Sequence, residues 1–184
     1  MNRKFLTVAL IGASLFLGGC AVTDGSNNNG DDQFQVFDPA DIPASAPSDA
    51  LAVDPAVFAN EYSEYSFRVG SGPTWCTING EEKYVICEQI ETDANYDALP
   101  VPDTCNLSFG YQFKLSENKP KDEDISRITC ASGLYADGSA APTLNSRETL
   151  TVGGITCFVS DITARCDNKR GNYIVLGPEV WAKG

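Results

Sequence analysis

The sequence predicts an all-β fold: a small, disulfide-crosslinked antiparallel β sandwich or open barrel with two related hairpin halves. Six cysteines lie between residues 76 and 166, and an even set in an exported domain is typical of a disulfide framework. Short segments in the same region alternate between apolar and polar residues, and Gly, Pro, Asn and Asp recur between them. No segment has a sustained apolar period of 3.6, so strands are expected to dominate.

The N-terminus has the pattern of an export signal. Arg3 and Lys4 precede an apolar run over residues 5–16, and the small residues Gly18 and Gly19 follow it. As a helix the run would rise only about 18 Å, short of the roughly 30 Å hydrocarbon core of a bilayer. We therefore expect residues 1–19 to be removed rather than to remain as a membrane span.

The first of the seven cysteines has a context of its own. Leu17-Gly18-Gly19-Cys20 resembles the bacterial lipobox, which implies that the Cys20 thiol receives a diacylglyceryl group and that cleavage occurs just before it. Each buried methylene adds about 0.8 kcal/mol, so several acyl chains on one residue anchor a protein firmly. The resemblance implies a lipoprotein on the extracytoplasmic face of the cell membrane; the alternative is an ordinary secretory peptide followed by a stray cysteine.

Residues 20–60 are predicted to be an acidic flexible tether that starts at the lipidated cysteine. From residue 21 to residue 60 there are seven Asp and no Lys or Arg, and Gly, Asn, Ser, Ala and Pro fill much of the rest. Such a composition buries too little apolar surface to fold. A flexible chain of this length reaches about 35 Å. Asp54 followed by Pro55 can begin one short helix.

Residues 61–184 form the predicted disulfide-rich β domain, with 18 acidic and 11 basic residues and hence a net charge of −7. The tether adds seven negative charges, so the chain without its signal carries −14. This surface should repel phosphates, so we expect no nucleic-acid partner. The length fits a single domain, and we expect a monomer.

Residues 74–89 and 155–168 each read as strand, turn, strand, with one cysteine in each strand, like an internal repeat. In the first segment, a four-residue loop over residues 80–83 places Cys76 directly opposite Cys87. Opposed residues at a non-hydrogen-bonded antiparallel position have Cα atoms about 4.5 to 5.5 Å apart, within disulfide range. The first hairpin is therefore predicted to carry its own crosslink.

In the second segment, Cys157 lies opposite Cys166 with either a two-residue loop at Asp161-Ile162 or a four-residue loop centred there. We expect the looser turn, because isoleucine disfavours positive φ. The remaining pair is Cys105 with Cys130. No two cysteines have the close spacing of a zinc site, so no metal is expected.

Alternation also predicts strands at residues 64–69, 108–115 and 148–152, within a total of about eight or nine. The candidate core residues are apolar positions of these strands and of the two hairpins: Phe67, Trp75, Ile86, Phe109, Tyr111 or Phe113, Val159 and Ile174 to Leu176.

The cysteine pattern also resembles a known family. Phe67 with "GSGPTWC", then "YVIC", "CNLSFGYQF", "ITCAS", "ITC", "ARCDN" and "GNYIVL", is similar to a family of actinobacterial secreted proteins and lipoproteins with six cysteines. The resemblance covers most of residues 64–178. It differs at Gly171-Asn172-Tyr173, where the family reads "GHGF". It implies an exported envelope protein of unknown function and no specific activity.

Several kinds of catalysis are excluded by composition or context. The chain has no histidine, which excludes Ser-His-Asp and Cys-His catalysis and histidine zinc sites. Ser116 and Lys119 match S-x-x-K, but they follow a strand and precede Pro120, whereas that motif requires a helix start. A surface turn is the better interpretation.

Two acidic features remain as alternatives. Residues 121–124 offer carboxylates for weak calcium binding, but they lack the glycine and distal glutamate of an EF-hand loop, so a solvated acidic turn is favoured. Carboxylate pairs such as Glu81 with Glu82, or Glu88 with Glu91, have the residue types of a glycosidase.

The resulting hypothesis is a lipid-anchored, non-enzymatic envelope module that binds an envelope partner or ligand, with no cofactor and no catalytic residue. The alternatives are a carboxylate-dependent cell-wall glycoside hydrolase and an inert surface antigen. The aromatic candidates for a recognition patch are Tyr62, Tyr65, Trp75, Tyr96, Tyr111, Tyr173 and Trp181.

Overall fold

The computed structural model describes residues 37–118 and 123–184. Within these ranges the chain forms twelve strands and three short 3-10 helices, η1 (Pro55–Val57), η2 (Glu91–Asp93) and η3 (Gly138–Ala140). The predicted signal peptide and Cys20 lie outside the described residues.

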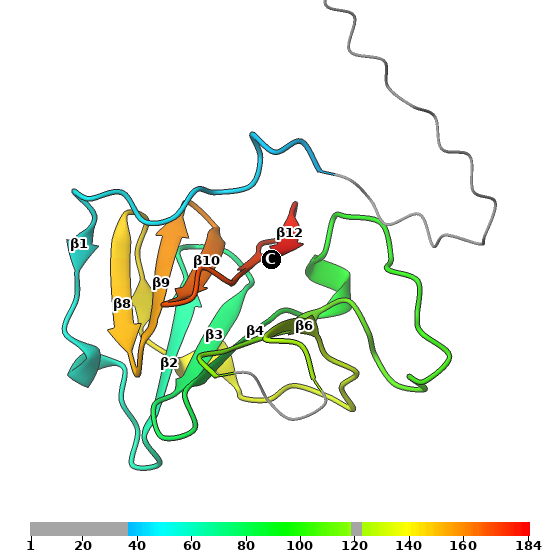
Figure 1. The fold of residues 1–184 in the computed structure, drawn as a ribbon, viewed down its shortest axis with the longest axis horizontal. Coiled ribbons are helices and arrows are strands. Elements are labelled where there is room, and N and C mark those ends of the chain that lie inside the picture. The colour runs from blue at the N-terminus through cyan, green and yellow to red at the C-terminus, as the bar shows by residue number, and fades with distance from the viewer. Residues whose placement is uncertain (1–36, 119–122) are drawn as a thin grey trace, which may run out of the picture. The chain divides into compact units, whose positions relative to one another are not determined.

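The strands form two six-stranded sheets. The first sheet has the order β1 (Leu51–Ala52), β8 (Glu148–Val152), β9 (Ile155–Ser160), β10 (Thr163–Asn168), β11 (Tyr173–Leu176), β12 (Trp181–Lys183). The second has the order β6 (Ser126–Ile128), β5 (Gln112–Ser116), β4 (Tyr84–Glu88), β3 (Trp75–Asn79), β2 (Glu64–Val69), β7 (Thr143–Leu144). Figure 1 shows β8, β9 and β10 side by side, and likewise β2 and β3.

The predicted all-β, disulfide-crosslinked sandwich is confirmed. All strand pairs are antiparallel except the two pairs that β1 makes with β8 and β2 makes with β7. The hairpins β3–β4 and β9–β10 occupy the centres of the two sheets, as the two related halves predict. There are more strands than the expected eight or nine, because β1, β6, β7 and β12 are edge strands of only two or three residues.

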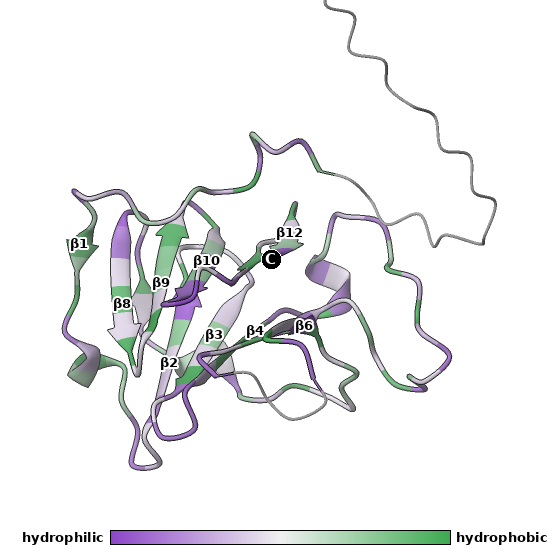
Figure 2. Cartoon of the chain, viewed as in Figure 1, coloured by the Kyte–Doolittle hydropathy of each residue, from purple (hydrophilic) through white to green (hydrophobic). Residues whose placement is uncertain are grey.

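The core lies between the inward faces of the two sheets. Alternate residues of a strand point to opposite faces, and Figure 2 shows the corresponding alternation of hydropathy along β2. Buried core residues include Phe67, Phe113 and Leu150. Trp75 and Ile86 neighbour the core-facing Cys76 and Cys87 in sequence and so lie on the outer face of the second sheet. Ile86 is buried there, as predicted, whereas Trp75 is only half-buried.

Other predicted core residues lie in three settings: Val159, Ile174 and Leu176 are in the main cluster, Val175 is in a smaller one, and Phe109 and Tyr111 are half-buried at the edge.

All three predicted disulfides are present: Cys76–Cys87, Cys105–Cys130 and Cys157–Cys166. In the first hairpin Asn79 pairs with Tyr84, which confirms the four-residue loop.

The prediction of a looser turn in the second hairpin is wrong. Ser160 pairs with Thr163, so Asp161 and Ile162 form a two-residue loop. Asp161 has φ of 57°, and Ile162 is not among the residues with positive φ. This is the pattern of a type II′ turn, which requires positive φ only at its first central residue. The conformational preference of isoleucine is therefore not violated.

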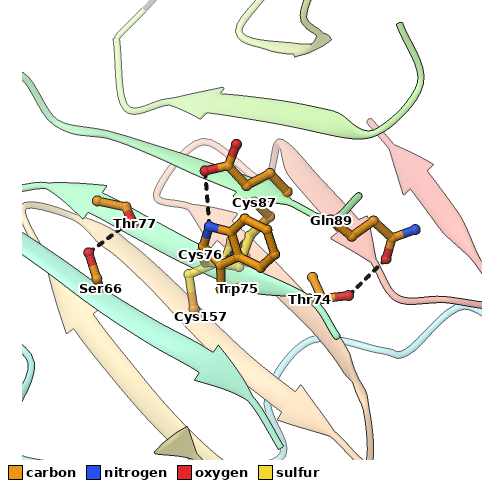
Figure 3. Close-up of a disulfide and its surroundings, with 10 residues drawn as sticks. Ser66, Thr74, Trp75, Cys76, Thr77, Cys87, Gln89 and Cys157 are labelled. Carbon is orange, nitrogen blue, oxygen red and sulfur yellow. Dashed lines mark hydrogen bonds between the residues drawn. A yellow bond between two sulfur atoms is a disulfide. The ribbon is translucent and has the colours of Figure 1, made fainter. Parts of the chain in front are cut away.

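The two hairpin disulfides meet in the core. The Sγ atoms of Cys87 and Cys166 are 3.8 Å apart, although they belong to different sheets. Figure 3 shows Cys76, Cys87 and Cys157 gathered at this point. The crosslinks thus contribute to packing between the sheets as well as to each hairpin.

Residues 37–60, which composition assigned to the tether, make specific contacts with the β domain. The Phe37 ring packs edge-on against Tyr96 and Trp181, with centroids 6.3 and 5.9 Å away. Strand β1 pairs with β8, and Arg165 donates to the carbonyl of Pro43. The folded domain therefore begins before residue 61, because isolated apolar residues and backbone hydrogen bonds order a segment whose average composition is polar.

Two local predictions have different outcomes. The predicted short helix is present as η1, where the Asp54 side chain accepts from the backbone N–H of Ala56 at 2.9 Å. The strand expected over residues 108–115 begins only at Gln112, because Gly110 has φ of 99° and turns the chain away from an extended path.

Candidate functional site

A buried carboxylate on the outer face of the second sheet holds a loop across that face. We call residues 131–139 the latch loop. Glu88, at the end of β4, is 1% exposed. Its Oε2 accepts from the backbone N–H of Tyr135 at 2.8 Å, and its Oε1 accepts from that of Ala136 at 3.0 Å. The loop is therefore attached to the sheet through its own backbone.

Two side chains complete the shell around Glu88. The indole Nε1 of Trp75 donates to Oε1 at 3.0 Å and also to the carbonyl of Ala136 at 3.0 Å. Gln112 Nε2 donates to Oε2 at 2.9 Å. Each carboxylate oxygen thus receives two donors. These four hydrogen bonds use both oxygens of the carboxylate as acceptors.

The latch loop has a second attachment through Tyr135. Its hydroxyl donates to Glu64 Oε1 at 2.7 Å and lies 2.8 Å from the hydroxyl of Tyr84. Burial, followed by the hydrogen bonds to Tyr84 and Glu64, raises the pKa of Tyr135. Lys114 Nζ lies 3.7 Å from the Tyr84 ring centroid, and burial together with the charge of Arg127 lowers the pKa of Lys114.

The latch loop forms one wall of a groove with two adjoining hollows, both lined by Ile90; we call it the Ile90 groove. The first hollow has a volume of about 150 Å³ and is lined by Glu88, Gln89, Ile90, Glu91, Ser108, Tyr111, Gln112, Ala131, Gly133 and Leu134. The second has a volume of about 370 Å³ and is lined by Arg68, Gly72, Pro73, Thr74, Trp75, Ile90, Asp137, Gly138 and Ser139.

The amide side chains in the first hollow are already paired within the protein. Gln89 Oε1 accepts from the Thr74 hydroxyl at 2.9 Å (Figure 3), and its Nε2 donates to the Tyr96 hydroxyl at 3.0 Å. Burial raises the pKa of Tyr96. Gln112, which donates to Glu88, accepts from Thr129 through Oε1. These groups have little capacity left for a ligand.

The rim of the first hollow is apolar with one acidic side. The side chains of Ile90 and Leu134 are 44% and 53% exposed. Tyr111 is half-buried, and its pKa is raised by burial and then by the charge and hydrogen bond of the exposed Glu91. The hollow therefore offers apolar walls and a carboxylate at its edge.

The sequence-predicted residues are distributed unevenly about this site. The carboxylate pair Glu88 and Glu91 lines the first hollow, whereas Glu81 and Glu82 lie in the exposed turn of the first hairpin. The disulfide Cys105–Cys130 joins the two segments that pair at Ser108 and Ala131, where they form a wall of the groove.

The cysteines of the two hairpins form the one cluster of potential metal-ligating side chains found among the described residues. Sγ atoms of Cys76, Cys87 and Cys166 lie within 4.8 Å of one another. All three are bonded in disulfides, so the cluster offers no thiolate.

The two remaining motifs lie away from the groove. Ser116 is buried at the end of β5, where its carbonyl accepts from Asn168 at 2.9 Å, and Lys119 lies outside the described residues. Of the acidic segment 121–124, residues 121 and 122 are also outside them, and Glu123 pairs with Arg127 at 2.6 Å.

The predicted aromatic set does not gather in one patch. Trp75 and Tyr111 line the Ile90 groove, and Tyr96 is buried, with its hydroxyl accepting from Gln89 of the first hollow. Trp181 lines a different hollow, and Tyr62, two residues before β2, is exposed. Sequence reasoning missed Ile90 and the latch loop; the available signal was the isolated apolar Leu134 among loop residues.

Comparison with protein-family models, curated proteins and solved structures found no match to this chain. Among the residues that the structure describes, no helix combines the length and apolar character needed to cross a membrane. The family resemblance of the cysteine pattern remains a prediction.

Proposed function

We propose that the protein is a lipid-anchored envelope protein on the extracytoplasmic face of the cell membrane, and that its β domain is a non-enzymatic binding module whose ligand occupies the Ile90 groove. The export signal and the lipobox-like segment ending at Cys20 support the location. Three disulfides support an oxidising compartment. The groove supplies the binding surface.

The observation that carries the non-enzymatic proposal is the hydrogen bonding of Glu88. A glycosidase of the carboxylate type requires one carboxyl that gives a proton and a second that faces it across the scissile bond. Glu88 and Glu91 line one hollow, but Glu88 accepts from four donors and holds the latch loop. Using it in catalysis would disrupt the wall of the site.

The anchor is tested in the cell with a clickable fatty-acid analogue and membrane fractionation. We expect label and membrane partitioning for the native chain. Cys20→Ala should carry no label and should either be released from the membrane or remain unprocessed, whereas the neighbouring Thr23→Ala should behave as the native chain does. Normal processing and membrane partitioning of Cys20→Ala would reject the anchor.

The binding module is tested with the full chain carrying Cys20→Ala, incubated with envelope fractions. We expect retention of an envelope component without release of reducing sugar. Sugar release that Glu91→Gln abolishes would favour the glycoside hydrolase instead. Absence of any retained component would favour an inert surface protein.

A further inference from the structure

We propose that the ligand of the Ile90 groove is a polypeptide segment of a partner protein, which inserts one apolar side chain into the first hollow and places a basic group beside Glu91. The inference rests on the proposed binding function and specifies the class of ligand.

The size of the first hollow fits a single side chain. Its volume is about 150 Å³. An engineered apolar cavity of about that volume in another protein binds benzene. A branched aliphatic or aromatic side chain is therefore the right size. The second hollow adjoins it at Ile90 and is walled by Pro73 and Trp75, so residues flanking the inserted one have room along the groove.

The hydrogen bonding of the first hollow favours an apolar group over a sugar. Glu88, Gln89 and Gln112 use their polar atoms on partners within the protein. Sugar hydroxyls that enter this hollow would give up their hydrogen bonds to water and find no partners in the protein to replace them, which is unfavourable. An apolar side chain has no hydrogen bonds to water to lose, and it removes the exposed surfaces of Ile90 and Leu134 from water.

The charge of the site favours a basic neighbour. Glu91 lines the first hollow and Asp137 the second, and both are exposed. Arg68 lines the second hollow but not the first, which has no basic residue in its lining. The whole chain has a net charge of −12, so its field also attracts cations. An apolar residue flanked by Lys or Arg is therefore complementary to the groove.

The test uses three synthetic peptides, Ac-Lys-Leu-Lys-NH₂, Ac-Glu-Leu-Glu-NH₂ and Ac-Lys-Gly-Lys-NH₂, with methyl-labelled full chain carrying Cys20→Ala. At low salt we expect Ac-Lys-Leu-Lys-NH₂ to shift the Ile90 and Leu134 methyl resonances. The acidic peptide should bind at least about tenfold more weakly, and the glycine peptide should leave both methyls unshifted.

Two variants and one control locate the interaction. Ala131→Leu fills the first hollow and should abolish the methyl shifts, whereas Ala56→Leu adds the same bulk in η1, outside the groove, and should not. Glu91→Lys should reverse the preference between the basic and acidic peptides. Glu91 is exposed, so Glu91→Lys is expected to fold even if Ala131→Leu does not.

The inference is overturned if the glycine peptide shifts the methyls equally, if Glu91→Lys leaves the preference unchanged, or if chitotriose and not the peptides shifts them. In those cases a component retained from the envelope fractions would still support a binding module with another ligand. Failure of the envelope experiment, in contrast, would reject the module itself.

Discussion

The two disulfide hairpins and the latch loop show how differently local and distant contacts determine structure. The hairpins are closed by crosslinks between residues 11 and 9 positions apart, each with a Cα–Cα distance of 4.0 Å. The latch loop is held by contacts between Glu88 and backbone groups 47 and 48 positions away. The hairpins could thus be predicted from spacing, whereas the loop could not.

The same difference separates the fold from the site. The hairpins lie at the centres of both sheets, and their disulfides meet at 3.8 Å in the core. The latch loop lies on the outer face and supplies a wall of the Ile90 groove. Disrupting the hairpins and disrupting the latch loop should therefore have different consequences for stability and for binding.

The largest effect is expected from breaking a hairpin crosslink. The double variant Cys76→Ala/Cys87→Ala should lose about 3 kcal/mol through the entropy of the unfolded chain and about 2 kcal/mol through lost packing in the core. The matched variant Cys105→Ala/Cys130→Ala should lose only about 3 kcal/mol, because Cys130 is exposed. Urea unfolding measures both. A larger loss for the second variant would contradict the central role of the hairpins.

The next effect comes from releasing the latch loop. Glu88→Ala leaves four donors without their acceptor, and we expect a loss of about 4 kcal/mol together with a changed environment of the Ile90 and Leu134 methyls. The exposed control Glu82→Ala should change stability by less than about 0.5 kcal/mol. If Glu88→Ala lost less than about 1 kcal/mol, solvent rather than Glu88 would be satisfying those donors.

Predictability from the sequence follows this division. Alternation and cysteine spacing were sufficient for the sandwich, the register of both hairpins and the buried Phe67, but they left Tyr111 and Phe113 as alternatives, of which Phe113 is the buried one. Glu88, in contrast, has the pattern of an outward polar residue at a strand end. Its burial depends on the latch loop, a segment with no periodicity, so neither it nor the groove could be identified from local pattern.

The N-terminal segment shows the same limit. The average composition of the predicted tether is polar and gives no weight to Phe37, whose ring packs against Tyr96 and Trp181 far along the chain. Average polarity therefore gave the wrong extent of the folded region, while the single capping contact at Asp54, which is local, was predicted correctly.

A smaller effect with a distinct pH dependence is expected at Tyr135. Tyr135→Phe removes the hydrogen bond to the half-buried Glu64 and should cost about 1 kcal/mol at pH 7, because solvent screens part of the interaction. In the native chain the raised pKa keeps the folded phenol protonated while the unfolded one ionises above about pH 10. This contribution is thus present below pH 10 and is lost as the pH rises further.

The advantage of the native chain over Tyr135→Phe should therefore shrink when urea unfolding is measured at rising pH from about 9 to 11. Tyr62→Phe, at a side chain that is 70% exposed, should show neither the loss at pH 7 nor the change in the difference. A constant difference across this range would mean that the phenol proton of Tyr135 does not contribute to latching the loop.

The smallest effect is expected at the turn of the second hairpin, where the substitution should raise stability instead of lowering it. Asp161 has φ of 57°, which glycine adopts without the steric cost that a Cβ imposes. Because a type II′ turn favours glycine at this position, Asp161→Gly should stabilise the protein by about 0.5 kcal/mol in urea unfolding. Ile162→Gly should instead destabilise it by about the same amount, since that residue has no positive φ to relieve and glycine gains entropy in the unfolded chain. If both substitutions stabilised the protein, positive φ at Ile162 would be indicated, and the turn would be of type I′ instead.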